Sequence, residues 1–207
     1  MIKHICEQKS EQWHNLRWGL ITGTRAKEMF AGKSTATYQN LVYQLAGEIL
    51  NAEIDEPDYS NEWMERGVEL EPQARQLYEG LFDCHIEQVG FVTPDIDNEF
   101  VEWVGISPDG LTSDSGLIEI KCPKLTTHLA YIKGDKLPSE YKYQVYFQLY
   151  VTGLDYCDFI SYYPGLKPFI TRVLPDKEIF AEIEAKLREV IFEVSNVLKM
   201  YNSYEYL

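Results

Sequence analysis

The chain has 207 residues, of which 45% are hydrophobic and 14% aromatic, so it is long enough to bury a sizeable core as a single domain spanning residues 1–207. Its net charge of −14 argues against a uniformly basic surface for binding nucleic acid. No apolar run is long enough to cross a bilayer and no signal-peptide pattern opens the chain, so we expect no membrane partner and a cytoplasmic location.

The acidic charge is concentrated in one part of the sequence. Residues 48–115 contain 18 acidic side chains and two arginines. By contrast, residues 1–36 carry six basic and three acidic side chains, and residues 121–142 carry five basic and two acidic ones, a net charge of +3 in each case. The two basic stretches could therefore line a path for phosphate groups, while the acids face solvent or serve as metal ligands.

Capping residues and apolar residues at helical spacing predict four helices in the first part of the chain. Ser10 would cap the first helix, and Thr22 or Thr24 would cap the second. Pro72 should kink or restart the fourth, because proline has no amide hydrogen to donate. The expected helices are Ser10–Gly19, Thr22–Phe30, Thr37–Leu50 and Ser60–Tyr78.

Short apolar segments bounded by turn residues predict strands in the second part of the chain. Ile86–Val92 and Phe100–Ile106 would form a meander that leads into the acidic turn Ser107–Gly110, and Leu117–Lys121 would follow as a short apolar strand. This order of elements predicts an α/β fold with a central mixed sheet flanked by helices. The later elements are expected over Ser139–Val151 (helix), Cys157–Tyr163 and Pro168–Val173 (strands), and Asp176–Tyr201 (a long amphipathic helix).

An acidic residue on a turn precedes an acidic residue and a lysine that are two positions apart. The segment Ser107-Pro108-Asp109-Gly110 is followed by Glu119-Ile120-Lys121. In a strand, side chains alternate between faces, so Glu119 and Lys121 should project from one face and the flanking isoleucines from the other. A bridging cation and an ammonium group would then meet one phosphate.

These residue types suit the hydrolysis of a phosphodiester. Its negative charge repels nucleophiles, so hard cations must neutralise it, and Asp109, Glu119 and the Ile120 carbonyl offer the oxygen ligands that such cations prefer. Lys121 could orient or deprotonate water, especially if burial lowers its pKa. Taken singly, Ser-Pro-Asp-Gly is an ordinary turn and Glu119 with Lys121 an ordinary salt bridge. Their conjunction favours a metal-dependent nuclease.

The motif resembles the signature of the restriction-endonuclease-like nucleases, and the longer match is to the phage lambda exonuclease branch with its viral recombinase relatives. That resemblance implies a restriction-endonuclease-like core. Any one of the matching blocks is weak, whereas four in the correct order are specific. The blocks are Trp13–Thr22, Gly67–Glu71, Leu117–Pro123 and Tyr143–Val145.

The resemblance implies a Mg²⁺-dependent exonuclease that degrades duplex DNA in the 5′-to-3′ direction, releases 5′-mononucleotides and leaves 3′ single-stranded tails. Glu71 would join Asp109, Glu119 and Ile120 as a ligand of two Mg²⁺ ions, for which Mn²⁺ is a substitute. Lys121 would act on the attacking water. Glu69 competes with Glu71 for the role of third carboxylate, and Glu71 is favoured.

The resemblance also implies a pocket for the 5′-terminal phosphate. Arg17, Thr24, Ser107 and Gln144 match positions that form this pocket in the family, and a forked guanidinium with neutral hydrogen-bond donors suits phosphate oxygens. Met64 falls where the family places an apolar wedge between terminal bases, although a methionine on a helix is more often part of the core.

Three further properties are implied by the resemblance. They are a ring-shaped homotrimer that encloses double-stranded DNA ends, a single-strand-annealing partner in recombination, and an origin in a phage or prophage within a bacterial host. Two alternatives stay open. The same core could belong to a restriction or junction-resolving endonuclease, or the chain could be a non-catalytic DNA-binding subunit.

Overall fold

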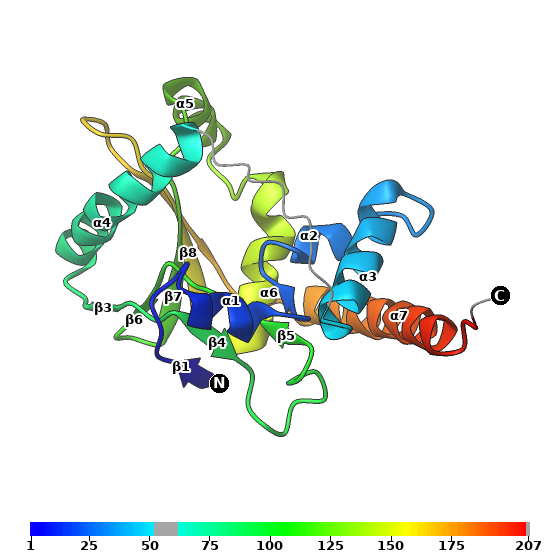
Figure 1. Ribbon diagram of the computed structural model, residues 1–207. Coiled ribbons are helices and arrows are strands. Elements are labelled where there is room, and N and C mark those ends of the chain that lie inside the picture. The colour runs from blue at the N-terminus through cyan, green and yellow to red at the C-terminus, as the bar shows by residue number, and fades with distance from the viewer. Residues whose placement is uncertain (52–61, 206–207) are drawn as a thin grey trace.

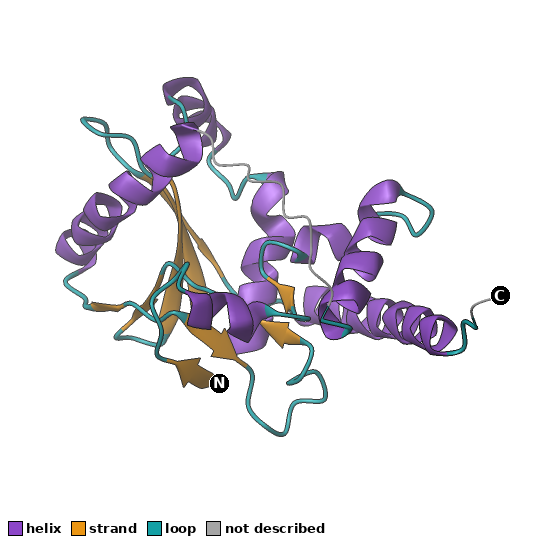
Figure 2. Cartoon of the chain, viewed as in Figure 1, coloured by secondary structure: helices purple, strands orange, loops and turns teal. Residues whose placement is uncertain are grey.

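In the computed structural model, which describes residues 1–51 and 62–205, with side chains from residue 65 onward in the second range, helices cover both faces of a central sheet (Figure 1; Figure 2). Among the described helices, none is both long and apolar enough to cross a bilayer. The helices are α1 (Glu11–Arg17), α2 (Ala26–Met29), α3 (Ala36–Ile49), α4 (Glu62–Phe82), α5 (Leu125–Gly134), the 3₁₀ turn η1 (Ser139–Tyr141), α6 (Lys142–Thr152) and α7 (Lys177–Asn202).

The central sheet contains five strands in the order β3-β6-β7-β8-β9. β7 and β8 are parallel, and the other neighbours are antiparallel. A parallel pair needs a long crossover, and here it contains α5 and α6. This mixed sheet with flanking helices confirms the predicted α/β fold class. The five strands are β3 (Ile86–Glu87), β6 (Gly110–Thr112), β7 (Gly116–Lys121), β8 (Tyr156–Ser161) and β9 (Phe169–Val173).

The two faces of the sheet bury separate apolar clusters. On one face, Ile118 and Ile120 of β7 pack with Ala74 and Tyr78 of α4. On the other face, Leu117 belongs to the larger cluster, which includes residues of α2, α3, α6 and α7. The alternation of β7 side chains therefore places Glu119 on the face that α6 covers, away from α4. Figure 1 shows α4 on one side of the sheet and α6 on the other.

Two small sheets attach the N-terminal segment to the rest of the molecule. β1 (Ile2–His4) pairs with β4 (Phe91–Thr93) in antiparallel fashion, and β2 (Ile21–Thr22) pairs with β5 (Val104–Gly105) in parallel. The segment between β1 and β2 includes α1. It is therefore fixed at both ends beside the start of β6 (Figure 1).

The predicted meander before β6 is reduced to one antiparallel bridge between Val92 and Ile106. The expected strand Ile86–Val92 divides into β3 and β4, which belong to different sheets. Gly90 lies at the division, where an added Cβ would be 2.1 Å from the Cys6 carbonyl oxygen. Such contact with the N-terminal segment cannot be read from local sequence. The expected strand Phe100–Ile106 is reduced to β5, because Trp103 turns back to donate to the Phe100 carbonyl at 2.8 Å.

The predicted helices are found with changed limits. Ser10 accepts from the Trp13 amide at the start of α1, as a cap should. The second helix shrinks to the four residues of α2. The start expected at Ser60 lies outside the described residues. α4 continues through Pro72 as one helix and does not restart there. Packing of its apolar face against the sheet offsets the lost hydrogen bond.

Candidate active site

The residues of the sequence motif meet where β6 begins beside the end of β7. The Lys121 ammonium is 2.5 Å from Glu119 Oε1, and both side chains leave the same face of β7. Asp109 lies at a bend directly before β6, and its Oδ2 accepts a hydrogen bond from the Ile120 amide at 2.6 Å. The Ser-Pro-Asp-Gly segment therefore presents a carboxylate to the edge of β7.

Glu119 is held by side chains from α6 as well as by Lys121. Gln144 Nε2 donates to Oε1 at 2.7 Å, and Gln148 Nε2 donates to Oε2 at 2.6 Å. The two glutamines are one helical turn apart and so present both amides to the same carboxylate. The Glu119 side chain is only 2% exposed, and these contacts fix its orientation.

Asp109 lies close to two other carboxylates. Burial raises the pKa of this carboxyl well above its usual range, and the nearby negative charges of Glu119 and Glu71 raise it further. Lys121 and the Ile120 amide act in the opposite direction. For Lys121 itself, burial disfavours the ammonium, but Glu119 and Asp109 outweigh burial and raise its pKa. The lowering of the Lys121 pKa that the sequence suggested therefore does not occur in this structure.

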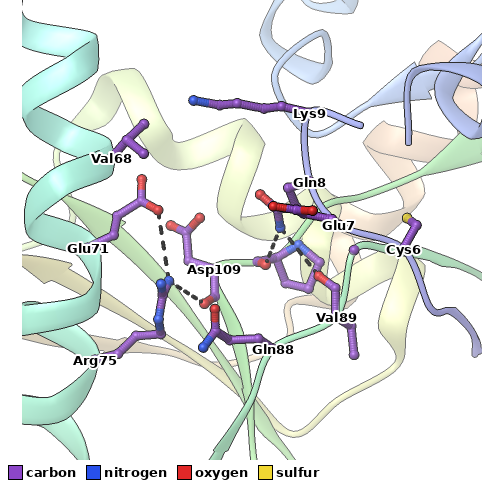
Figure 3. Close-up of a pocket in the computed structure, with 12 residues that line it drawn as sticks. Cys6, Glu7, Gln8, Lys9, Val68, Glu71, Arg75, Gln88, Val89 and Asp109 are labelled. Atoms are coloured by element: carbon purple, nitrogen blue, oxygen red, sulfur yellow. Dashed lines mark hydrogen bonds and ion pairs between the residues drawn. The ribbon is translucent and has the colours of Figure 1, made fainter. Parts of the chain in front are cut away.

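Of the two candidates for the third carboxylate, Glu71 faces the site. It lies on α4 beside Asp109 and lines the same cavity (Figure 3). Burial raises the pKa of its carboxyl, against the attraction of Arg75, Lys121 and other cations. Glu69 is exposed and is not among the residues that line this cavity.

The four residues expected to bind a terminal phosphate line one cavity of 200 Å³ together with Asp109, Glu119 and Lys121. Arg17 Nη1 donates to Ser107 Oγ at 3.0 Å, and its guanidinium stacks 4.1 Å from the centre of the Trp13 ring. Thr24 Oγ1 is 3.2 Å from Thr22 Oγ1. The amide of Gln144 faces Glu119, so it borders both the cavity and the carboxylates.

A second cavity of 330 Å³ opens on the other side of Asp109 (Figure 3). Its walls come from the N-terminal segment, from α4 and from the loop between β3 and β4. Arg75 Nη1 donates to the Asp109 carbonyl at 3.2 Å and lies 3.8 Å from Glu71. Asp109, Gln8 and Lys9 line both cavities, so the two cavities adjoin at Asp109, and together they are called the groove.

Sequence reasoning overlooked several residues of this groove. Gln148 follows Gln144 by one helical turn, and that spacing is a signal that could have found it. Arg75 follows Glu71 by the same interval on α4. Lys9 gives no local signal, because its position depends on how the N-terminal segment is folded back. Met64 lies in α4, but its side chain is outside the described residues, so the proposed wedge is not tested.

Known proteins resemble this chain in both sequence and fold. Residues 12–155 match the family described as the YqaJ-like viral recombinase domain. The structure is similar to that of the alkaline exonuclease LHK-Exo from Laribacter hongkongensis, with 34% identity, a TM-score of 0.81, and coverage of 93% of this chain and 96% of that chain. The complex of LHK-Exo with dAMP gives 35% identity and a TM-score of 0.80 with the same coverage.

More distant similarities are consistent with this relationship. A phage-related exonuclease from Haemophilus somnus 129PT shares the fold at 16% identity, with a TM-score of 0.65 and coverage of 90% of this chain and 98% of that chain. Uncharacterized protein R354 of Acanthamoeba polyphaga mimivirus is 25% identical over 168 residues, which are 75% of this chain, and the match spans only 29% of that protein. The chain therefore belongs to the family of the YqaJ-like viral recombinase domain.

Proposed function

We propose that the protein is a Mg²⁺-dependent exonuclease that degrades the 5′-ended strand of duplex DNA, releases 5′-mononucleotides and leaves a 3′ single-stranded tail. The observation that carries this proposal is that Asp109, Glu119 and Lys121 share one cavity with Arg17, Thr24 and Ser107. A pocket for a terminal phosphate placed directly beside the reacting groups would restrict cleavage to the bond next to a strand end. The complex of LHK-Exo with dAMP supports a site of mononucleotide size.

The donor set suits a hard divalent cation. Glu71, Asp109 and Glu119 supply carboxylate oxygens, and the Ile120 carbonyl should leave β7 on the same side as its amide, which faces Asp109. The raised pKa of Asp109, caused by burial and by neighbouring carboxylates, is the condition that a bound cation relieves. Across residues 1–51 and 65–205, no three acidic, histidine or cysteine side chains are grouped as a preformed coordination site.

When bound, two Mg²⁺ ions would neutralise the phosphodiester and ease attack by water, and the same oxygen ligands would accept Mn²⁺. The chain's own groups then divide the remaining work. Gln144 and Gln148 hold the Glu119 carboxylate in place. Lys121 lies within reach of both carboxylates and would orient the attacking water. Its pKa would fall once the charge of these carboxylates is neutralised, so its amine could then take up a proton from the water.

An assay with end-labelled linear duplex tests the proposal. We expect the 5′-ended strand to shorten from its end in Mg²⁺, with no degradation in the presence of a chelator and none of an uncut circular duplex. Cleavage of the circle would favour the endonuclease alternative. If Asp109→Ala left every activity unchanged, the non-catalytic alternative would be supported instead.

Two variants separate chemistry from end recognition. Lys121→Ala should reduce cleavage by a factor of about 10² to 10⁴ while sparing DNA binding in Ca²⁺. Arg17→Ala should remove the preference for 5′-phosphorylated over 5′-hydroxyl ends, since the forked guanidinium is lost. Lys199→Ala, on the exposed last turn of α7, is the matched control and should behave as the parent. An Arg17→Ala enzyme that discriminates as the parent does would contradict the pocket assignment.

We further propose that the enzyme works as a homotrimeric ring around double-stranded DNA ends, together with a single-strand-annealing protein. This part of the proposal is supported by membership in the viral recombinase family. Light scattering in solution should give three times the monomer mass of 24.1 kDa, and a monomeric mass would contradict the ring.

A further inference from the structure

Lys9 adopts a backbone conformation that lysine rarely takes. Its φ angle is +70°, in the left-handed region where a side chain is crowded by its own backbone and which glycine occupies without strain. A residue persists in this region only where its surroundings determine the conformation, and such residues cluster at functional sites. Lys9 lies between β1 and α1, where contacts of the neighbouring residues fix its backbone.

The residues on either side of Lys9 are firmly attached. Gln8 Nε2 donates to the Val89 carbonyl at 3.3 Å and to the Pro108 carbonyl at 3.2 Å. Ser10 donates from Oγ to the Glu7 carbonyl at 2.6 Å and also caps α1. The backbone is therefore fixed on both sides of Lys9, and its side chain is directed outward from a rigid point.

That side chain extends over the groove. Lys9 lines both cavities that flank Asp109, and Figure 3 shows it reaching from the N-terminal segment toward Val68 of α4 above Glu71 and Asp109. Its charge lowers the pKa of Glu71, against the burial that raises it. Lys9 is exposed, and within residues 1–51 and 65–205 its ammonium makes no hydrogen bond or ion pair. Arg75, the other cation of this cavity, is already engaged by Glu71 and Asp109.

The groove has a direction under the proposed function. Arg17 marks the end that would hold the terminal phosphate, and Asp109 marks the scissile bond. The cavity beyond Asp109, over which Lys9 extends, is then on the path of the strand that continues toward its 3′ end. A compact, mobile ammonium is well suited to one backbone phosphate there, because phosphate contacts supply affinity without regard to sequence.

We propose that Lys9 binds the backbone phosphate that follows the scissile bond on its 3′ side, and that the left-handed backbone is kept because it directs this side chain over the groove. The inference rests on the proposed exonuclease function and adds a substrate-binding residue to it. Lys9 is a binding residue that positions the strand, with no part in bond making.

The variant Lys9→Gly separates the two effects of this residue. Glycine accepts the left-handed backbone, so the thermal midpoint should stay the same or rise. The lost ammonium should raise KM for 5′-phosphorylated linear duplex about two- to fivefold with kcat unchanged, as for a single exposed ion pair. In Ca²⁺, the slope of log Kd against log salt should fall by about one. Lys9→Arg keeps the charge and should restore most of the affinity.

Ser115→Gly is the matched control for the backbone. Ser115 has a φ angle of +69° in the turn between β6 and β7, at the opposite end of β7 from Lys121. Its replacement should have the same effect on stability as that of Lys9 and should leave KM and the salt slope at the parent values. A matching rise in KM for Ser115→Gly would assign the effect to the backbone and overturn the proposal.

The position of the contact is tested with modified DNA. A neutral methylphosphonate at the first linkage 3′ of the scissile bond should raise KM for the parent but cause no further rise for Lys9→Gly, because the contact is already absent. Additive effects, or parental KM and salt slope for Lys9→Gly, would overturn the Lys9 assignment. Failure of the parent to shorten linear duplex would instead refute the proposed function, so the two failures are distinguishable.

Discussion

Each oxygen of Glu119 accepts a short hydrogen bond from a glutamine of α6. Desolvation of a buried carboxylate that lacks such donors costs free energy. A carboxylate whose donors are flexible would not keep a fixed orientation. The glutamines also carry no charge, so they orient Glu119 without cancelling the negative charge that would attract a cation. Lys121 supplies the only opposite charge within 4 Å of Glu119 among the described residues.

Gln148→Leu tests this arrangement. The change keeps the approximate size of a residue that is 1% exposed but leaves Glu119 Oε2 without its donor, which should cost about 1–3 kcal/mol of stability. We expect the Mg²⁺ concentration for half-maximal cleavage to rise roughly tenfold, as for other residues that orient metal ligands.

A titration of activity against Mg²⁺ would measure this shift. Gln76→Leu, at an exposed position of α4, is the control and should leave the titration unchanged. An unaltered Mg²⁺ requirement in Gln148→Leu would show that Glu119 does not need this donor for cation binding.

Individual residues of the site were predictable to different degrees. Asp109, Glu119 and Lys121 are separated by no more than twelve positions, and alternation along one strand explains how two of them meet. Arg17, Thr24, Ser107 and Gln144 came from resemblance to a family, since nothing in their spacing brings them together. Lys9 and Arg75 escaped prediction because their places depend on the contact between α4, the N-terminal segment and the start of β6.

At the scale of elements, α4 is attached to the sheet by one polar cluster as well as by apolar packing. Tyr78 of α4 donates to Asp158 Oδ2 at 2.7 Å, and Arg172 of β9 donates to both oxygens of the same carboxylate at 2.9 and 2.8 Å. Asp158 lies on β8 and is buried. Because Glu71 is also on α4, this cluster helps to set the distance between Glu71 and the carboxylates of the sheet.

Asp158→Ala should therefore destabilise the protein. Removal of the buried carboxylate leaves the Tyr78 hydroxyl and the Arg172 guanidinium without their partner, and we expect a loss of about 2–4 kcal/mol. For a chain of this length, the thermal midpoint should fall by roughly 4–15 °C.

Thermal unfolding followed by circular dichroism would measure the loss. Tyr78→Phe removes the hydroxyl but keeps the ring and the ion pair of Asp158 with Arg172. It should cost about 1 kcal/mol, which makes it the graded control. A midpoint for Asp158→Ala equal to that of the parent would show that this cluster does not help to secure α4.

Long elements with a strong hydrophobic periodicity were predicted well, whereas short strands were not. The helix capped by Asp176 and the strand Leu117–Lys121 agree with α7 and β7 within a few residues. Each of the strands β1, β2 and β5 has only two or three residues and pairs with a segment more than 75 positions away. Pairing of this kind depends on tertiary contacts, so no local pattern indicates it. The helix α5 (Leu125–Gly134) was not predicted.

At the scale of the whole molecule, the site contains negative charge that the protein alone does not balance. Burial raises the pKa values of both Asp109 and Glu71, and neighbouring carboxylates add to the effect. For a carboxyl with a raised pKa, the folded state holds its proton more firmly than the unfolded state does. Stability from this source is therefore present below the unfolded-state pKa, about 4, and is lost as pH rises through the folded-state value.

Divalent cations should restore the stability that the protein loses as pH rises. Addition of Ca²⁺, which can occupy oxygen sites without supporting cleavage, should raise the thermal midpoint near pH 8 and have little effect near pH 4, where the carboxyls are protonated. At a concentration one hundred times Kd, the stabilisation should be about 2.7 kcal/mol. Thermal scans with Ca²⁺ or chelator across this pH range would measure it.

Asp109→Asn is the matched variant for these scans. It removes one of the repelling charges, so the variant should be more stable than the parent in chelator near pH 8 and should gain less from Ca²⁺. A Ca²⁺ effect of equal size in the variant and the parent would place the cation elsewhere on the molecule.

The pairing of β1 with β4 and of β2 with β5 also has a consequence for synthesis on the ribosome. Arg17 and Thr24 emerge early, but the strands that receive their segment and the glutamines of α6 are translated later, over residues 91–148. At ordinary elongation rates, translation from Thr24 to Gln148 takes on the order of ten seconds. A nascent chain therefore cannot assemble the candidate site before most of its length has been made.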